Sequence, residues 1–328
     1  MKLLTGMRLL LLGCLMIVLS AADLAAQTYP ERPIKVIVPA NAGGPLDVLA
    51  RVLGEGLRAR VGQTFVIENK PGANFGIGAQ ACKGSPPDGY TVCLLNISAM
   101  SINPFLYSTL GYDPEKDFEP ISNLVAARSV LMVNAAVPAK TLAELVEYSK
   151  KNPDKMNYGS FGTGGAAQLL IEWVKDKTGL KMTHVPFTGA APALIAFERN
   201  DVQVINPVPT PIVVQNIRAG KSYGILSFGG KRIPELPEVP TATEAGLPPM
   251  NFDNWFGLFA PAGTPADRID FLAKELIRML RDPAFLEKNI HAAGYDEIGN
   301  TPAEFRASLP GYRLRAEELV KISGIQRK

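Results

Sequence analysis

The stretch Ile34-Lys-Val-Ile-Val-Pro-Ala-Asn-Ala-Gly-Gly-Pro-Leu-Asp-Val-Leu-Ala-Arg51 decides the fold class of this 328-residue chain. A β-branched run at Ile34–Val38 predicts a buried strand, and the apolar spacing from Leu46 to Arg60 predicts an amphipathic helix. The segment Asn41-Ala-Gly-Gly44 forms the turn between them. A strand that passes through a glycine-rich turn into a helix opens a βαβ unit, which is typical of an α/β fold with largely parallel sheets.

The same alternation of short apolar runs and helical patterns continues along the chain and predicts two series of elements. The first series continues with strand Thr64–Glu68, helix Gly76–Lys83 and strand Thr91–Leu95. The second comprises strand Val130–Val133, helix Leu142–Lys151, strand Asn157–Gly159, helix Ala166–Lys177, strand Met182–Val185, helix Ala190–Arg199 and strand Val202–Asn206. Two C-terminal helices follow, Pro265–Arg281 and Pro302–Ile322, and we expect Pro310-Gly311 to kink or split the second of these.

Two segments bracket the second series, Phe118–Ala126 and Tyr223–Phe228, and we expect them to be strands that cross between two lobes. A double crossing makes the first lobe discontinuous. We therefore expect lobe I to comprise residues 27–126 and 229–328, and lobe II to comprise residues 127–228. The length agrees with two domains of roughly 100–200 residues each.

The composition narrows the class of function. The chain has 34 Lys and Arg against 31 Asp and Glu, a formal net charge of +3, and 47% apolar residues. These ordinary globular values argue against a disordered chain and against a nucleic-acid partner. Two histidines (His184 and His291) and three cysteines occur without the spacing of a metal site, so we expect neither a metal nor another cofactor.

The N-terminus has the features of an export signal. Lys2 and Arg8 precede an apolar run from Leu9 to Ala22, and a stretch of mainly small residues, Ala21 to Ala26, ends the segment. This pattern predicts a signal peptide over residues 1–26, cleaved near Ala26, and a mature protein in the periplasm. Leu11-Leu-Gly-Cys14 loosely resembles a lipoprotein cleavage box, but it lies in the middle of the apolar run, which favours cleavage near Ala26.

An oxidising compartment permits a disulfide between Cys82 and Cys93, which lie 11 residues apart on a predicted helix and the next strand. Packing of a helix on a strand often leaves the two Cα atoms beyond the ~7 Å that a disulfide tolerates. We therefore expect two unpaired buried side chains and leave the disulfide open as the alternative.

Glycine-rich turns follow four of the predicted strands, two in each lobe. They are Asn41–Gly44, Pro71–Gly76, Gly162–Gly165 and Thr188–Ala190. In an open α/β sheet, ligands bind beyond the carboxyl ends of the strands, where the first turns of the helices offer unpaired N–H groups and the positive end of the helix dipole. Two lobes that face each other through such turns would hold an anion mainly by backbone groups.

Motifs for catalysis are weak in comparison. Gly76-Ile-Gly-Ala-Gln-Ala81 only approximates the dinucleotide fingerprint, and it precedes a short helix. Gly159-Ser-Phe-Gly162 is not the nucleophile motif GxSxG, and no histidine lies in a hydrolase-like position after it. Asp47 is placed to cap its helix, and His184 lies among apolar neighbours as structural histidines do. We expect no catalytic residues and no enzymatic activity, and keep a secreted α/β enzyme as the less favoured alternative.

Many ordered stretches, from Tyr29 to the C-terminal helix, carry a resemblance to a known family. They include Tyr29-Pro-Glu-Arg-Pro-Ile-Lys-Val-Ile-Val-Pro39, Asp47-Val-Leu-Ala-Arg51, Glu68-Asn-Lys-Pro-Gly-Ala73, Pro87-Asp-Gly-Tyr-Thr91, His184-Val-Pro-Phe187, Pro237-Glu-Val-Pro-Thr241 and Gly257-Leu-Phe-Ala-Pro-Ala-Gly-Thr-Pro265. The chain resembles the Bug-type periplasmic solute-binding proteins of tripartite tricarboxylate transporters.

The resemblance implies a two-lobed periplasmic binding protein fold of type II, each lobe a Rossmann-like sheet flanked by helices, joined by two crossover strands. It further implies closure around one small organic carboxylate, no enzymatic activity and no required metal. The loaded receptor would deliver its ligand to two membrane subunits, one small with four spans and one large with many. Some members serve a sensor kinase instead or have no obvious transporter.

Closure should bury the ligand among residues of the four turns and the strand ends. The candidate ligand-binding residues are Asn41, Asn74, Phe75, Ser160, Thr163, Gly164, Thr188, Gly189, Ala190 and Asn206. Compared with the family, Asn74-Phe75 stand where paired glycines are usual, and Thr188 stands where Lys is common. Because this set contains no charged side chain, we expect a monocarboxylate whose apolar or aromatic body rests on Phe75 and Leu46, in preference to citrate or a free amino acid.

Overall fold

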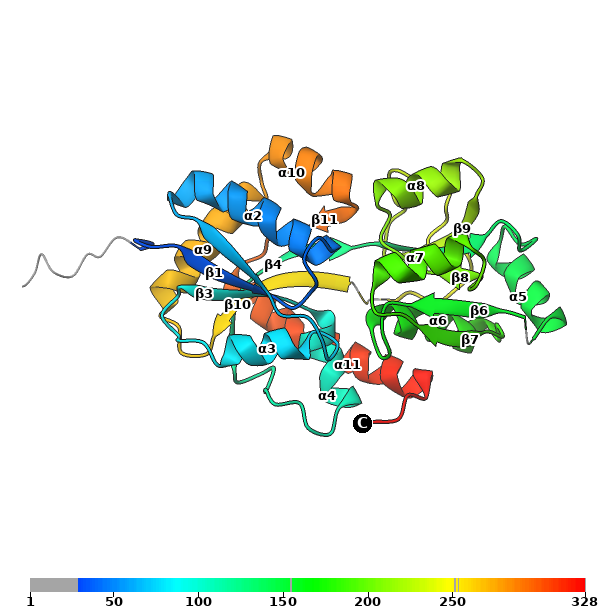
Figure 1. Ribbon diagram of the computed structural model, residues 1–328, viewed down its shortest axis with the longest axis horizontal. Coiled ribbons are helices and arrows are strands. Elements are labelled where there is room, and N and C mark those ends of the chain that lie inside the picture. The colour runs from blue at the N-terminus through cyan, green and yellow to red at the C-terminus, as the bar shows by residue number, and fades with distance from the viewer. Residues whose placement is uncertain (1–28, 154, 251, 253, 328) are drawn as a thin grey trace, which may run out of the picture.

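The computed structural model describes residues 29–153, 155–250, 252 and 254–327, and the predicted signal peptide lies outside this part of the chain. Two sheets lie side by side, each with helices packed on its faces (Figure 1). The predicted α/β fold class with two lobes is confirmed. The division of the chain into lobes at residues 126 and 228 stays a prediction.

The sheet of lobe I has the strand order β11-β4-β10-β3-β1-β2. Its strands are β1 (Ile34–Val38), β2 (Phe65–Asn69), β3 (Thr91–Asn96), β4 (Phe118–Ala127), β10 (Asn254–Pro261) and β11 (Tyr295–Glu297). The helices are α2 (Pro45–Val61), α3 (Gly76–Lys83), η2 (Ser98–Ile102), α4 (Asn103–Leu106), α9 (Ala266–Met279), α10 (Pro283–Asn289), η3 (His291–Ala293) and α11 (Pro302–Ser323). The elements of this lobe without a counterpart among the predicted ones are η2, α4, the central strand β10, α10, η3 and β11.

The sheet of lobe II has the order β7-β6-β8-β5-β9. Its strands are β5 (Ser129–Asn134), β6 (Asn157–Ser160), β7 (Thr183–Pro186), β8 (Val204–Ile205) and β9 (Ser222–Phe228). The helices are α5 (Leu142–Lys151), α6 (Ala166–Thr178), α7 (Ala190–Glu198) and α8 (Pro211–Arg218). The strand predicted over Val202–Asn206 is reduced to two residues, so Asn206 lies just beyond its end.

Both sheets are mixed, where the sequence predicted largely parallel ones. In lobe I, β1 is parallel to β2 and β3, whereas β10 runs antiparallel to β3 and β4. In lobe II, β6 is parallel to β7 and β8, whereas β5 runs antiparallel to β8 and β9. The reason is the double crossing. A strand that enters a lobe at the edge where the parallel strands end has to run against them.

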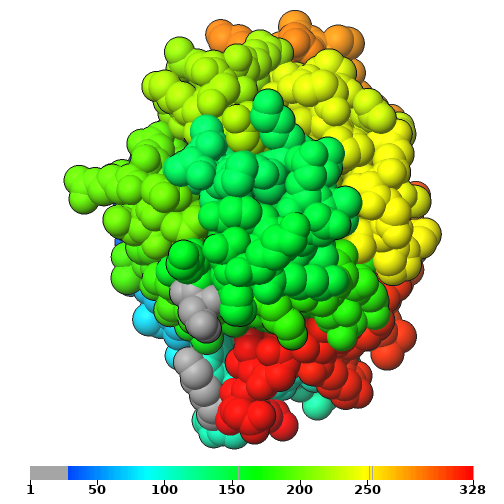
Figure 2. Space-filling view, turned by 90° about the vertical axis from the view of Figure 1, so that its right-hand side faces the viewer, coloured from blue at the N-terminus to red at the C-terminus, as the bar shows by residue number. Residues whose placement is uncertain are grey.

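The chain passes directly from β4 to β5 through Arg128. The second connection, which leads back from lobe II to lobe I, is longer than expected. Strand β9 pairs with β5 inside the second sheet, and the residues after β9 stay on lobe II. Ile233, Leu236 and Val239 are buried in the same cluster as residues of β5 and β8. Figure 2 shows this segment, in yellow, along the flank of lobe II. Its packing favours a lobe II that extends past Phe228.

Helix α11 belongs to the C-terminal part of the chain but packs against α6 of lobe II. Its C-terminal end, in red, lies beneath that lobe in Figure 2. The sequence predicted a kink or a split at Pro310-Gly311. The helix is not split there and runs from Pro302 to Ser323. Pro310 is exposed, whereas Phe305 and Leu319 on either side are buried and hold both halves in place. Packing of this apolar face outweighs the hydrogen bond that proline removes.

The expectation of two unpaired thiols is wrong, because Cys82 and Cys93 form a disulfide. Helix α3 packs closely on β3, and the two Cα atoms lie 6.0 Å apart, within the range that a disulfide spans. Both cysteines are fully buried. The bond ties α3, whose first residue follows the glycine-rich turn of β2, to a central strand of the sheet.

We expect the double substitution Cys82→Ala and Cys93→Ala to lower the free energy of unfolding by about 3 kcal/mol, because a closed loop of this length constrains the unfolded chain by that amount. Chemical denaturation of both proteins under oxidising conditions measures the difference. A reductant should destabilise the parent protein similarly and leave the double variant unchanged. Equal stability of the two proteins under oxidising conditions would contradict the expectation.

Candidate functional site

The candidate site lies where the parallel strands of the two lobes end. β1, β2 and β3 end at one edge of the first sheet, and β6, β7 and β8 end at one edge of the second. The two edges are in close contact at the glycines after β6. A Cβ added at Gly164 would lie only 2.3 Å from Leu106 Cδ1 of lobe I, and a Cβ added at Gly165 would lie 3.7 Å from Asn74 Oδ1. The turn after β2 and the turn after β6 therefore meet, as the sequence predicted from their glycines.

Helices that begin at these edges lack side-chain caps. No side chain caps the first turn of α2, α3, α6 or α7, whose N-cap residues are Gly44, Phe75, Gly165 and Gly189. Thr141, Asp282 and Thr301 do cap α5, α10 and α11, away from the edges. Uncapped N–H groups at a helix start are suited to an anionic ligand.

The turn after β2 has an unusual backbone. Ala73, Asn74 and Phe75 have φ values of 47°, 47° and 71°, a left-handed run without glycine. This conformation costs roughly 1–2 kcal/mol per residue for L-amino acids. Asn103 of α4 supports the turn, since it accepts a hydrogen bond from Asn74 Nδ2 (2.8 Å) and donates one to the Asn74 carbonyl (2.9 Å).

Sequence reasoning missed Asn103 and also Tyr112, whose hydroxyl bonds to Asn103 Nδ2 (3.1 Å) and donates to the Ala99 carbonyl (2.7 Å). The proline after Asn103 is a helix-start signal that could have found this element. Asn103 and Tyr112 are both buried, so they form a rigid support behind the turn.

The turn after β6 is held by Ser160 and Gln168. Ser160 Oγ donates to the Gly162 carbonyl (3.0 Å) and lies 2.6 Å from His184 Nε2, while Gly164 N–H donates to Gln168 Oε1 (2.7 Å). No histidine had a hydrolase-like position relative to Ser160 in the sequence, but the register of β6 and β7 pairs Tyr158 with His184 and so brings His184 beside Ser160. Ser160 is fully buried, and its contacts with the Gly162 carbonyl and the His184 imidazole support the turn.

Asn206 is the clearest polar group without a partner at this edge. It is 2% exposed, and neither its Nδ2 nor its Oδ1 has a hydrogen-bond partner in the described structure. Because β8 pairs Val204 with Tyr158 of β6, the same register brings Asn206 beside Ser160. The Ser129 hydroxyl, at the start of β5, is also buried and unpartnered in the described structure. Each such group costs roughly 1–3 kcal/mol if it stays unsatisfied.

The other candidate residues take different positions. Thr163 lies half-buried inside the turn after β6, and Gly189 and Ala190 lie half-buried at the start of α7. Asn41 and Thr188 are exposed, in the turns after β1 and β7. The structure therefore brings Asn74, the turn after β6 and Asn206 together, and it records no contact that joins Asn41 or Thr188 to them.

Charged groups near the site are paired with each other. Asp47 Oδ2 accepts from Gly43 N–H (2.9 Å) and from Arg51, which lowers the pKa of the Asp47 carboxyl. Lys70 pairs with Glu68 at 2.8 Å. Asp47 thus holds the turn before α2 through Gly43. It does not cap the first turn of the helix, although the sequence had suggested that role. Leu46 is buried in the core of lobe I, so the expectation that it offers surface to a ligand is wrong.

This architecture, two α/β lobes joined at the carboxyl edges of their sheets, is that of periplasmic binding proteins. Residues 49–304 match the family described as tripartite tricarboxylate transporter family receptor. The chain belongs to this family, which confirms the resemblance seen in the sequence. Among the described residues, no helix is both long and apolar enough to cross a membrane, and no three His, Cys, Asp or Glu side chains are grouped as metal ligands.

Relatives extend over nearly the whole chain. A UPF0065 protein of Bordetella pertussis is 34% identical over 94% of this chain and 95% of its own length. The structure of periplasmic binding protein BugD is 34% identical with a TM-score of 0.82, covering 92% of this chain and 100% of the other. The structure of R. palustris Rpa4515 with adipate is 30% identical with a TM-score of 0.84, over 92% and 100%.

The environment of His184 predicts how the stability of the folded protein changes with pH. Burial lowers the pKa of His184, Lys175 adds to the fall, and Glu172 opposes it. Between the ordinary value of about 6.5 and the lower folded value, the unfolded chain binds a proton that the folded chain does not. Through this group, stability should therefore fall as the pH drops below about 6.5.

We expect His184→Gln to lose less stability than the parent protein between pH 7.5 and pH 5, because glutamine keeps hydrogen-bonding capacity but does not titrate. Denaturant unfolding at several pH values measures the difference. His291, whose pKa is raised by Glu297, acts in the opposite direction but is common to both proteins. Parallel pH curves for the two proteins would contradict the assignment.

Proposed function

We propose that this protein is a periplasmic receptor that captures a small organic carboxylate between its two lobes. The observation that carries the proposal is the set of four uncapped helix starts at the edges where the strands of both lobes end. A carboxylate supplies acceptors for such N–H groups and the negative charge that the helix dipoles favour. The adipate bound to the related Rpa4515 supports this class of ligand.

The ligand would lie among the ten candidate residues. They are Asn41, Asn74, Phe75, Ser160, Thr163, Gly164, Thr188, Gly189, Ala190 and Asn206. In this proposal the helix starts hold the carboxylate, and the buried Asn206 amide gains the hydrogen bonds that it lacks in the structure. Ser160 acts indirectly, since its hydroxyl is already used to hold the turn.

The charged side chains near the site are paired with each other, which limits the charge that the ligand can carry besides one carboxylate. Asp47 and Lys70 both have partners, so a second carboxylate or an ammonium group would find amides and hydroxyls but no free counter-charge in this set. Burial of an unpaired charge is strongly unfavourable. We therefore propose a monocarboxylate with an apolar or aromatic body that rests on Phe75, which is half-buried.

Delivery of the ligand to the two membrane subunits of a tripartite tricarboxylate transporter follows from the family and is part of the proposal. The alternative is a receptor that reports its ligand to a sensor kinase or acts without a transporter. Uptake of the bound acid by cells with and without the membrane subunits separates the two. Uptake that depends on the subunits and on this protein supports transport, and unchanged uptake supports the alternative.

We expect carboxylates, and not neutral sugars, to raise the melting temperature of the purified protein. A ligand at a hundredfold excess over Kd stabilises the folded form by about 2.7 kcal/mol. A thermal-shift screen of aromatic acids, aliphatic monocarboxylates, dicarboxylates including adipate, and amino acids tests this. Stabilisation by sugars alone would overturn the anion site and with it the proposed function.

We expect Phe75→Ala to weaken binding of an aromatic monocarboxylate by about 1–3 kcal/mol, which is the range for full burial of a large apolar side chain. Calorimetric titration of both proteins with the best aromatic acid from the screen gives the ratio of Kd values. Phe271→Ala is the matched control, since this half-buried aromatic ring packs on Tyr29, away from the site. Tight binding of citrate or glutamate, unaffected by Phe75→Ala, would contradict the aromatic preference and leave the receptor class intact.

A further inference from the structure

Arg128 occupies the point where the chain leaves lobe I for lobe II. It is the single residue between Ala127, the last of β4, and Ser129, the first of β5. Any change in the angle between the lobes therefore includes a change in the backbone at or beside this residue. Hinges of this kind are a few residues at the ends of elements that absorb the rotation.

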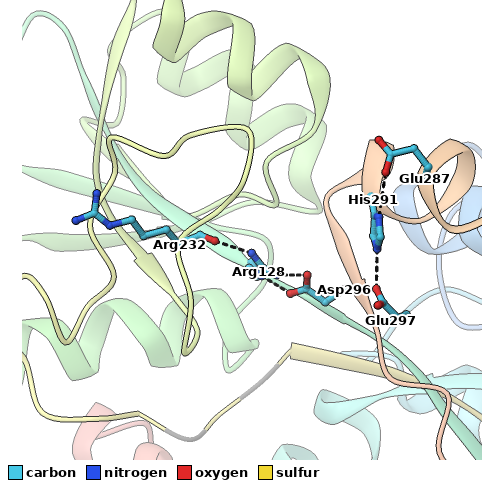
Figure 3. A network of polar contacts seen from close by, with 6 residues as sticks. All are labelled: Arg128, Arg232, Glu287, His291, Asp296 and Glu297. Carbon is cyan, nitrogen blue, oxygen red and sulfur yellow. Dashed lines mark hydrogen bonds and ion pairs between the residues drawn. The ribbon is translucent and has the colours of Figure 1, made fainter. Parts of the chain in front are cut away.

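The side chain of Arg128 contacts both lobes at once (Figure 3). Its Nε and Nη2 atoms donate to the two carboxylate oxygens of Asp296 on β11 of lobe I. Its Nη1 donates to the carbonyl oxygen of Arg232 at 2.7 Å. Arg232 belongs to the segment after β9, and the next residue, Ile233, is buried against lobe II. One guanidinium thus joins a strand of one lobe to a segment packed on the other.

Both acceptors of this guanidinium are themselves held in place. The Arg232 side chain donates to Glu244 Oε2 (2.8 Å) and to the Pro237 carbonyl (2.7 Å), which anchors the Arg232 backbone on lobe II. On lobe I, Glu297 next to Asp296 bonds to His291 Nε2 at 2.6 Å, and His291 also contacts Glu287 at 3.3 Å (Figure 3). The acceptors therefore move with their lobes.

A second contact between the lobes lies beside Asp296. A Cβ at Gly294 would lie 3.1 Å from Val208 Cγ1 and 3.2 Å from the Pro209 carbonyl oxygen, so glycine allows the turn before β11 to pack on the segment that follows Asn206. Gly229 also packs on Arg128, since a Cβ there would lie 3.7 Å from Arg128 Cγ. The region around Arg128 is packed in this arrangement of the lobes.

We infer that Arg128 and Asp296 form a hinge clamp, which holds the lobes at the angle seen here and opposes their opening in the absence of ligand. A guanidinium is planar and presents its donors in fixed directions. If lobe II rotates about residue 128, the bidentate bond to Asp296 and the bond to the Arg232 carbonyl cannot both keep their geometry. Opening must therefore break one of them, and the clamp shifts the equilibrium between open and closed forms.

The Arg128 side chain is 18% exposed and the Asp296 side chain 34%. This burial separates the pair from the exposed ion pairs of the surface, which contribute little. The Arg32–Asp88 pair within lobe I is such a surface pair, with a distance of 2.8 Å and side chains that are 62% and 38% exposed. It offers a matched control, because its removal also deletes an Arg–Asp contact but does not affect the connection between the lobes.

The test measures the distance between the lobes in the ligand-free protein, so its outcome does not depend on the proposed ligand. Spin labels are attached at Ala59→Cys on α2 and Gln215→Cys on α8, two exposed positions, in the chain without the predicted signal peptide. Cys82 and Cys93 are bonded to each other and do not react. Pulsed electron paramagnetic resonance then gives the distribution of distances between the labels.

We expect Asp296→Asn and Arg128→Met each to broaden this distribution and shift it to longer distances, while Arg32→Met leaves it unchanged. In the parent protein, 1 M salt should broaden it as well, and Asp296→Asn should respond less to salt. Melting curves establish that each variant is folded, and Asp296→Asn, which is nearly isosteric, carries the test if Arg128→Met is not. Distributions for folded Asp296→Asn that match the parent at low salt would overturn the clamp.

Discussion

The crossing from β4 to β5 through one residue constrains most of the architecture. Because β4 runs in the same direction as β3, it leaves the first sheet at the edge where β1 and β3 end, and the chain enters the second sheet at the corresponding edge. This connection requires the two carboxyl edges to lie close together. It also explains why β5 and β10, the strands entered from the other lobe, run antiparallel to their neighbours.

The chemistry of the candidate site follows from which polar groups the fold leaves without partners. The starts of α5, α10 and α11, away from the two edges, are capped by Thr or Asp side chains, although α9, also away from them, has no such cap. The helices α2, α3, α6 and α7 begin at the edges after glycine or Phe75 and have no side-chain cap. The buried amide of Asn206 adds two unpartnered groups next to them. Charged side chains nearby are paired within their own lobe or across the hinge. The result is a site with backbone donors and amides but little free charge, which suits a small anion.

Local pattern predicted most of the elements well. Helices Gly76–Lys83 and Leu142–Lys151 have the bounds that the sequence indicated, and the capping box of Thr141 explains the second. Several elements had no predicted counterpart. Of these, η2, α4, η3 and β11 have five residues or fewer and are too short to show a periodic pattern, whereas β10, α8 and α10 are longer and were also missed. Of the kink or split expected at Pro310, the split does not occur, because the apolar face of α11 packs on both sides of it, a tertiary effect that a local rule cannot include.

The sequence by itself determined the order of most strands and helices, the glycine-rich turns and the family, because these depend on residues close together in the chain or on ordered motifs along it. Only the tertiary structure decided the disulfide of Cys82, the contact of Ser160 with His184 and the support of Asn74 by Asn103. It also decided that Arg128 binds Asp296, which lies 168 residues away. The physical reason is that strand register and helix packing set these distances, and neither can be predicted from the local spacing of residues.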